Sequence, residues 1–466
     1  MSVACLLTAT LSFVSPSRIA TSMTTPLTIA ICSDAFYPSI GGVEHHILSI
    51  ATELVRRGNR VIVLTMQYPG YSGIRYLDVS DPADSSIKKL IKVFYLPIKT
   101  YSLGMEGLKL SITSGFGSLA LYRNIFLREG VEIIHGHQAN SFVALEAVWI
   151  GNAMGLRTIF TDHSLIRMGS PLTVLTNKIL SYALASTDRL IAVSAESGEN
   201  TSLRSGRSRL PGSVHIIPNA VDSRFMPDRS KVSDPADVIR IVTVSRLSFR
   251  KGADLLIRAI RAILSDSTMP NVHFDVVGPG SEAYISQLTA LGPCVTYHGG
   301  LPHDQVVNVL QSGHISLTTS LTEAFCIAVL EGAACGLEVV STAVGGVVNV
   351  LPPDYITLCR LEKELSGVEL VGGLKQTIAR VHSLGGPGNA GKRDRRAAEL
   401  HEFVRGNYSW PRVAEETETV YRLAMDQPRI GQWTRYMTVG GLVAAIVFFM
   451  CTMGISHVFS VMDSLW

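Results

Sequence analysis

The chain has 466 residues, of which 47% are hydrophobic and 17% are charged, and its formal net charge is +3. Typical domain sizes predict two or three folded units for this length. The small positive charge lacks the basic excess that duplex nucleic acid demands, so we do not expect a nucleic-acid partner.

Seven cysteines form an odd set that contains no C-x-x-C pair, and several of them lie within apolar runs. This pattern predicts buried thiols in a reducing compartment, not disulfides or a zinc site.

The first 26 residues contain a short apolar run, but no Lys or Arg precedes it as a secretory signal would require. We expect a disordered leader there.

Residues 27–222 alternate short β-branched runs with longer segments of helical period, which is typical of a parallel sheet covered by crossover helices. The clearest predicted helix has Val43, Ile47, Ile50 and Leu54 at helical spacing, and Gly58 follows as its C-terminal glycine. The strands expected in this half are "TIAICSD", "RVIVLTM", "KVFYLPI", "EIIHGHQ", "RTIFTDH", "RLIAVSA" and "VHIIPNA".

Two glycines, Gly41 and Gly42, open the first helix in "PSIGGVEHH". They could let the backbone approach an anion at the helix N-terminus, although a tight turn without a ligand explains them equally well.

His135 and His137 lie in the strand "IIHGHQ", and His163 ends the next strand. We expect only one of His135 and His137 to face a cleft, which disfavours a metal pair, and core histidines remain the alternative.

Residues 223–422 repeat the strand and helix alternation, with a predicted hinge in the Asp, Pro and Ser-rich stretch 227–237. The expected strands are "RIVTVSR", "NVHFDVVGP", "VTYHGG", "HISLTTS", "LEVVSTAVG" and "YITLCR". The fold class is therefore α/β, with two doubly wound, Rossmann-like domains in tandem. Such sheets bind ligands beyond the carboxyl ends of their strands, so the interdomain cleft is the expected site.

Cations and glycines follow the first strands of this second half. Arg246 and Lys251 lie in "SRLSFRKGAD", where they suit a diphosphate, although a basic surface turn is the alternative. Gly278 and Gly280 in "VVGPGS" could admit a flat base, or they form a common turn.

Two carboxylates interrupt the apolar segment "SLTEAFCIAVLEGAACG". Glu323 is partly explained as a helix cap. Glu331 is expected two turns inside the helix, where a carboxylate persists only by accepting hydrogen bonds. The vicinal hydroxyls of a ribose would supply two such bonds, and an internal partner is the alternative.

The segment from Thr438 to Val458 has no acidic or basic residue except His457, so a membrane-spanning helix is predicted over 437–459. Arg422, Arg429 and Arg435 precede it, and this bias predicts that the main body is cytosolic. A predicted loop from Gly385, "GGPGNAGKRDRR", precedes a final helix, and its basic cluster could touch anionic lipid or form a solvated face.

These motifs resemble retaining glycosyltransferases of the GT-B fold. More narrowly, "GGVEHHI", "FTDHSL", "VSRLSFRKG" and "TSLTEAFC" resemble the phosphatidylinositol N-acetylglucosaminyltransferases, which begin glycosylphosphatidylinositol anchor synthesis at the endoplasmic reticulum membrane. The likeness spans about residues 28 to 425. One departure is Val348 and Asn349, where the family usually has Pro and Glu.

The resemblance implies a role for each candidate residue. Glu331 would hold the ribose of UDP, Arg246 and Lys251 the diphosphate, and Glu323 would lie by the sugar. Gly42, beside Gly41, would face the phosphates, and His137 would lie near the reacting carbon. The resemblance also implies no metal or other cofactor, phosphatidylinositol as acceptor, and further subunits of a membrane complex. Another lipid-directed transferase, such as a mannosyltransferase, and a non-catalytic sugar-nucleotide-binding scaffold are the alternatives.

Overall fold

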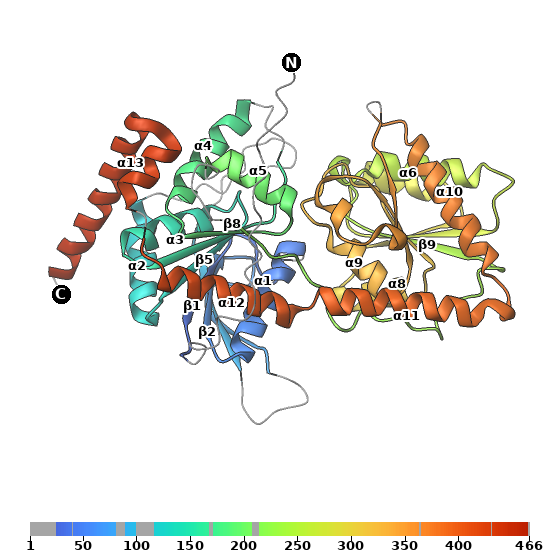
Figure 1. Ribbon diagram of the computed structural model, residues 1–466, viewed down its shortest axis with the longest axis horizontal. Coiled ribbons are helices and arrows are strands. Elements are labelled where there is room, and N and C mark those ends of the chain that lie inside the picture. The colour runs from blue at the N-terminus through green and yellow to red at the C-terminus, as the bar shows by residue number, and fades with distance from the viewer. Residues whose placement is uncertain are drawn as a thin grey trace, which may run out of the picture.

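A computed structural model describes residues 25–39, 41–80, 89–98, 116–166, 171–206, 214–362, 365–429 and 431–464. Most of the predicted leader therefore lies outside the described residues. The described chain folds into two α/β domains that lie side by side, as Figure 1 shows.

The N-terminal domain is built on an eight-stranded sheet with the order β3-β4-β2-β1-β5-β6-β7-β8. Its strands are parallel except for β3, which runs antiparallel to β4. The strand order reverses between β1 and β5. Open sheets of this kind bind their ligands at such a reversal, beyond the carboxyl ends of the two strands. The strands are β1 Thr28–Cys32, β2 Arg60–Met66, β3 Gly73–Asp78, β4 Leu90–Leu96, β5 Ile133–His137, β6 Arg157–Asp162, β7 Arg189–Ala192 and β8 Val214–Ile216.

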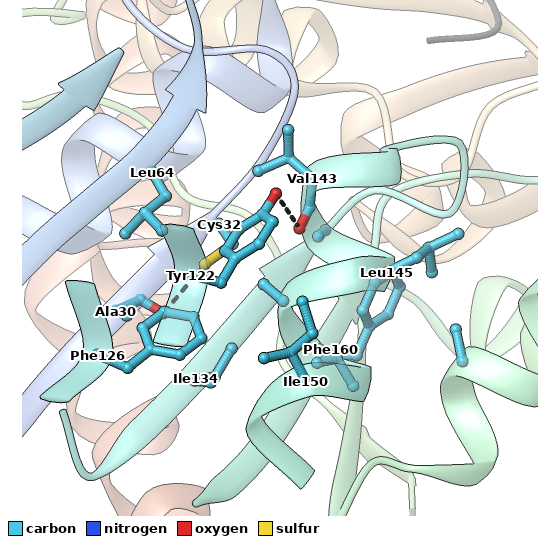
Figure 2. Close-up of a cluster of buried hydrophobic side chains, with 14 of the residues drawn as sticks. Ala30, Cys32, Leu64, Tyr122, Phe126, Ile134, Val143, Leu145, Ile150 and Phe160 are labelled. Carbon is cyan, nitrogen blue, oxygen red and sulfur yellow. Dashed lines mark hydrogen bonds between the residues drawn. The ribbon is translucent and has the colours of Figure 1, made fainter. Parts of the chain in front are cut away.

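Crossover helices cover both faces of this sheet (Figure 1). They are α1 Gly42–Arg56, α2 Phe116–Glu129, α3 Phe142–Ala153, α4 Pro171–Ala185 and α5 Ala195–Ser205. Helix α1 confirms the predicted amphipathic helix, because Ile47, Ile50 and Leu54 are buried on one face of it. Gly58 has φ +93 just beyond its C-terminus. Figure 2 shows one core layer, in which Tyr122 and Phe126 of α2 pack near Leu64 of β2 and the Tyr122 hydroxyl donates to the Val143 carbonyl.

The C-terminal domain is built on a six-stranded sheet with the order β11-β10-β9-β12-β13-β14, and all of its pairings are parallel. This confirms the predicted tandem of doubly wound domains. Its strands are β9 Ile239–Val244, β10 Val272–Val277, β11 Val295–Gly299, β12 Ile315–Thr318, β13 Glu338–Thr342 and β14 Ile356–Cys359. The helices are η3 Phe249–Lys251, α6 Ala253–Leu264, α7 Glu282–Thr289, α8 His303–Gln311, α9 Ile327–Ala334, η4 Gly345–Asn349, η5 Pro353–Tyr355, α10 Val368–Ser383, η6 Pro387–Asn389 and α11 Ala390–Asn407.

The chain returns to the N-terminal domain through helix α12, Trp410–Asp426. Trp410, Val413 and Tyr421 belong to the same core as Ile29 and Ile47. In Figure 1, α11 and α12 run end to end along one side of both domains. The sequence segment 223–422 therefore contributes to both domains, and its last helix ties them together.

Two local features depart from the predictions. The β3 edge strand was not predicted, because most of its residues are exposed and it lacks the apolar run of the central strands. The basic cluster of "GKRDRR" lies in the first turns of α11, not in a loop, and Arg393 and Arg396 there pair with Asp234 and Glu338.

The described cysteines are free thiols. Cys32, Cys335 and Cys359 are buried in the two domain cores, and Cys451 is exposed. Burial raises the pKa of Cys359 to about 11, so this thiol stays protonated and unreactive near neutral pH.

The last helix, α13, covers Gln432–Ser464 and packs against α3 and α4 (Figure 1). It is not straight, because the hydroxyls of Tyr436 and Thr452 lie 3.1 Å apart. In a straight helix these positions would be separated by about 24 Å along the axis. None of the helices within the described residues combines the length and the apolar character needed to cross a membrane.

Candidate functional site

A partly buried cation and carboxylate meet where β9 and β12 end. The Lys251 ammonium lies 2.5 Å from a Glu323 carboxylate oxygen, which also accepts a hydrogen bond from the Ser320 hydroxyl at 2.7 Å. Burial works to lower the pKa of Lys251, but the neighbouring Glu323 outweighs it, so the pKa lies above its ordinary value and the side chain stays charged. Glu323 precedes α9 and is not its cap, which corrects the capping interpretation.

The backbone around Gly252 fixes this pair. Gly252 adopts φ +69, and an added Cβ would lie 1.8 Å from the Thr319 carbonyl oxygen. The Thr319 hydroxyl donates to the Lys251 carbonyl at 3.1 Å, and the Leu321 amide donates to the Arg250 carbonyl at 3.0 Å. The "SRLSFRKG" turn is therefore clamped onto the "TSLTEAFC" loop, although the two are far apart in the sequence.

Arg246 follows β9 and is exposed. Its guanidinium makes no side-chain hydrogen bond or ion pair with any residue that the structure describes. It is close enough to Lys251 to oppose the charge on that ammonium. Two cations with one carboxylate between them leave a net positive charge at this end of the sheet.

Glu331 has an internal partner that the sequence analysis did not identify. One of its carboxylate oxygens accepts a hydrogen bond from His303 Nε2 at 2.8 Å, and the residue is 6% exposed. Because α9 begins at Ile327, Glu331 lies just over one turn inside the helix, not two. The alternative of an internal hydrogen-bond partner is therefore correct for one carboxylate oxygen of Glu331. A role of Glu331 toward ribose stays a prediction.

His303 also links the two domains. Its ring lies 4.4 Å from that of His45 in α1 and 5.0 Å from that of Phe225. Its Nδ1 atom is buried and has no hydrogen-bond partner among the described residues. At the same interface, a Cβ on Gly42 would lie 3.8 Å from Ile327 at the start of α9. The glycine turn thus faces the loop that carries Glu323, as the predicted cleft requires.

A second interdomain contact involves the position where the chain departs from the family pattern. The Asn349 side-chain amide donates to a Glu196 carboxylate oxygen of α5 at 2.6 Å. Nearby, a Cβ on Gly346 would lie 2.7 Å from the Ser194 hydroxyl. Asn349 therefore bridges the two domains through a different pair of helices from the contact between His45 and His303.

The glycines after β10 serve packing within the domain. A Cβ on Gly278, which adopts φ +137, would lie 1.9 Å from the Ser245 carbonyl oxygen. A Cβ on Gly280 would lie 2.6 Å from that of Leu247. These approaches account for both glycines without a ligand, and contact with a base stays a prediction.

Four histidines of the N-terminal domain gather near the carboxyl ends of β5 and β6, namely His46 of α1, His135 and His137 of β5, and His163 just after β6. His135 and His137 are both fully buried, with ring centroids 4.1 Å apart. Residues two apart on a strand project from the same side of the sheet, so these two rings are neighbours. His135 is bonded to the Tyr421 and Thr161 hydroxyls, and the expectation that only one of the two faces the cleft stays a prediction. His137 Nδ1 lies 3.1 Å from His163 Nε2, and His46 Nδ1 lies 2.8 Å from the Asn219 side-chain oxygen.

These histidines are neutral at physiological pH. Burial lowers the pKa of His135 and of His163 to about 3, and it holds the pKa values of His46 and His137 well below the ordinary value. The Nε2 atoms of His46 and His137 are buried without a partner among the described residues. Unprotonated ring nitrogens in this position can accept hydrogen bonds from hydroxyl groups.

The same side chains form the candidate metal cluster of the described residues. His46, His137 and His163 each have a ring nitrogen within 4.8 Å of the other two. His137 and His163 already use facing nitrogens on each other, so a metal would have to break that contact. The geometry therefore fits hydrogen bonding to hydroxyl groups better than metal coordination.

Family models match both domains. Residues 40–225 match Glycosyltransferase Family 4, and residues 239–359 match Glycosyl transferases group 1. Sucrose-phosphate synthase from Thermosynechococcus elongatus shares the fold, with 18% identity, a TM-score of 0.61, and coverage of 86% of this chain and 99% of that one. Anabaena HepE in complex with UDP and glucose has 17% identity and a TM-score of 0.58, covering 85% of this chain and 100% of that one. Fold and domain matches together define a GT-B glycosyltransferase.

Relatives of higher identity narrow the class. A phosphatidylinositol N-acetylglucosaminyltransferase subunit of Homo sapiens is 42% identical over 421 residues, which cover 89% of this chain and 79% of that protein. Its counterpart in Arabidopsis thaliana is 37% identical over 403 residues, covering 86% and 82% respectively. The chain therefore belongs to this family of phosphatidylinositol N-acetylglucosaminyltransferase subunits.

Proposed function

We propose that this chain transfers N-acetylglucosamine from UDP-N-acetylglucosamine to phosphatidylinositol with retention of configuration, which is the first step of glycosylphosphatidylinositol anchor synthesis. The observation that carries the proposal is the 42% identity to the human relative over 89% of this chain. Incubating membranes that contain this chain with labelled donor should yield N-acetylglucosaminyl phosphatidylinositol. A labelled mannolipid from a mannosyl donor, or no product, would contradict it.

The cleft residues support this chemistry on the donor side. Lys251 and Arg246 carry positive charge toward the position of the diphosphate, where charge grows as the glycosidic bond breaks. Glu331 is oriented by His303 and keeps a second carboxylate oxygen for the ribose. Glu323, held by Lys251, can accept a hydrogen bond from a sugar hydroxyl. These assignments need no metal and no other cofactor.

On the acceptor side, the N-terminal domain offers neutral histidines. The unpartnered Nε2 atoms of His46 and His137 are buried, so they can accept hydrogen bonds from hydroxyls of the inositol ring only when the cleft opens around them. Retention requires the attacking hydroxyl to approach the face that UDP leaves, and the departing phosphate then takes the proton. His137 in this scheme orients the acceptor beside the reacting carbon.

Replacing Glu331 by Gln should weaken UDP binding about 10 to 150-fold, because one charge-assisted hydrogen bond contributes about 1.5 to 3 kcal/mol. Calorimetry with UDP measures the effect. Glu338→Gln is the matched control, since Glu338 pairs with Arg380 and Arg396 away from the cleft. If Glu331→Gln binds UDP as tightly as the wild type, the carboxylate serves only His303.

We also propose that the chain resides at the endoplasmic reticulum membrane within a multi-subunit transferase, with its two domains on the cytosolic face and the apolar sequence segment 437–459 as the anchor. The support is the apolar segment Thr438–Val458 and the exposed side chains of Ile446, Val447, Met450 and Met453. Spanning the bilayer requires the bent α13 to straighten, which would separate Tyr436 from Thr452.

The cytosolic orientation predicts that two sequons remain unmodified. Asn200 in "NTS" and Asn407 in "NYS" match the N-glycosylation pattern. Microsomes that contain the full chain should show no mobility shift after endoglycosidase treatment. An engineered sequon beyond Val458 is the positive control, and a glycan on either native site would place the domains in the lumen.

A further inference from the structure

A small cationic cavity lies at the edge of the N-terminal sheet opposite the cleft. It is lined by Arg157 and Arg189, the first residues of β6 and β7, and by Asp188, Gln427 and Arg435. Its volume is about 20 Å³, which accommodates a water-sized group such as a phosphate oxygen. Because catalysis is placed beyond the carboxyl ends of the strands, this cavity is a separate feature, about 20 Å away along β6.

Positive charge exceeds negative charge around this cavity. Asp188 lies 2.7 Å from Arg435 and 3.6 Å from Arg429. Four guanidinium groups gather here, those of Arg157, Arg189, Arg429 and Arg435. Among the described residues, no carboxylate oxygen other than those of Asp188 lies within 4.0 Å of any of them. One carboxylate therefore faces four cations.

Backbone carbonyl groups take up part of this excess, and those of Met425, Ser186 and Thr187 lie at the ends of α12 and α4. Arg157 donates to the Met425 carbonyl, Arg435 donates to the Ser186 and Thr187 carbonyls, and Arg429 donates to the Leu156 carbonyl. Each helix C-terminus is equivalent to about half a negative elementary charge. The two helix ends, of α12 and α4, together with Asp188 still leave a surplus of about 2 positive charges.

One donor beside the cavity is unused, on Arg429, which contacts the lining residue Asp188. Arg429 Nε is buried and has no hydrogen-bond partner among the described residues. Burial lowers the pKa values of Arg189 and Arg429, and the neighbouring guanidinium groups lower them further, against the opposing effect of Asp188. A buried donor beside crowded cations is stabilised when an anion supplies the missing acceptor.

We propose that this cavity binds a phosphate group, the chemistry that a lipid headgroup and free inorganic phosphate share. The planar guanidinium forks of Arg157 and Arg189 suit phosphate oxygens. Gln427 follows the last residue of α12, and Arg435 lies in the first turn of α13, so the bound phosphate holds the base of α13 against the N-terminal domain. The site is independent of the proposed transferase chemistry.

The test uses the full chain in phosphate-free detergent micelles with UDP at saturation, so that the cleft cations are already occupied. Calorimetric titrations with inorganic phosphate and, separately, with dihexanoyl phosphatidylglycerol distinguish the two sources. Saturable binding of either ligand supports the site, and binding of the lipid alone assigns it to a headgroup. Saturable binding of neither ligand overturns the proposal.

Variants locate the binding. Arg157→Gln and Arg189→Gln should each weaken it about tenfold or more, because each removes a charge-assisted contact. The control Arg412→Gln removes the same charge from α12 at an exposed position that pairs with Glu416. Wild-type affinity in both cavity variants would contradict the assignment.

A measurement on the wild type keeps the test valid if a variant fails to fold. The thermal unfolding midpoint should rise when phosphate replaces chloride at equal ionic strength, since a ligand of the folded state stabilises it. An unchanged midpoint at concentrations that saturate the calorimetric signal would count against the site.

Discussion

Replacing Lys251 or Arg246 by Ala should lower turnover about 100-fold or more at saturating UDP-N-acetylglucosamine. The charge that these cations meet is greatest when UDP departs, so their loss raises the barrier more than it weakens ground-state binding. Initial rates of labelled product formation in membranes with matched protein levels measure the effect.

The two substitutions differ in what they leave behind. Lys251→Ala removes the partner of Glu323, which is 11% exposed and retains the Ser320 hydroxyl as a donor. Arg246→Ala leaves no carboxylate without its ion-pair partner, because Arg246 has no side-chain partner among the described residues. It is therefore the cleaner test. The double variant Lys251→Ala with Glu323→Gln separates the effect of losing the cation from the effect of leaving the Glu323 carboxylate unpaired.

Arg261→Ala on the exposed side of α6 is the matched control for charge removal in the same domain. It should retain wild-type turnover. A basic turn without function would behave like this control, so wild-type rates in both Lys251→Ala and Arg246→Ala would defeat the diphosphate assignment.

The fold could be predicted because the central strands of parallel sheets are buried on both faces. Runs such as "RVIVLTM" are continuous and apolar, and they appear as β2 with five consecutive buried residues. The edge strand β3 lacks this signal because it is largely exposed. Helix α12 has a readable apolar face, but its sequence position does not indicate that this face packs on the first domain.

The site could be predicted only in part, because its contacts join residues that are far apart in the chain. The sequence identifies Glu331 as a costly buried carboxylate, but its partner His303 lies 28 positions away in another helix. His46 meets Asn219 across 173 positions. The histidine in "LPHDQ" at a helix start and the double histidine in "GGVEHH" were the available signals. Neither indicates its partner.

Acidification should destabilise the N-terminal domain strongly. Burial lowers the pKa of six histidines of the N-terminal domain, to about 4 for His45 and His215, to about 3 for His135 and His163, and well below 6.5 for His46 and His137. A group whose pKa falls on folding contributes stability above its unfolded pKa, and this contribution is lost as the pH falls toward the folded value. Each histidine should therefore cost about 1.4 kcal/mol between pH 7.5 and 5.5, or about 8 kcal/mol for the six.

Urea unfolding followed by the fluorescence of Trp410, which packs beside His46, measures this loss as a fall in the transition midpoint. His135→Gln should reduce the pH dependence by about one sixth, because one of the six titrating groups is gone. His457→Gln removes an exposed histidine and should leave it unchanged. A midpoint that stays constant from pH 7.5 to 5.5 would mean that these rings remain able to bind protons in the folded state. The neutral hydrogen-bond acceptors assigned to the acceptor side of the cleft would then be lost as well.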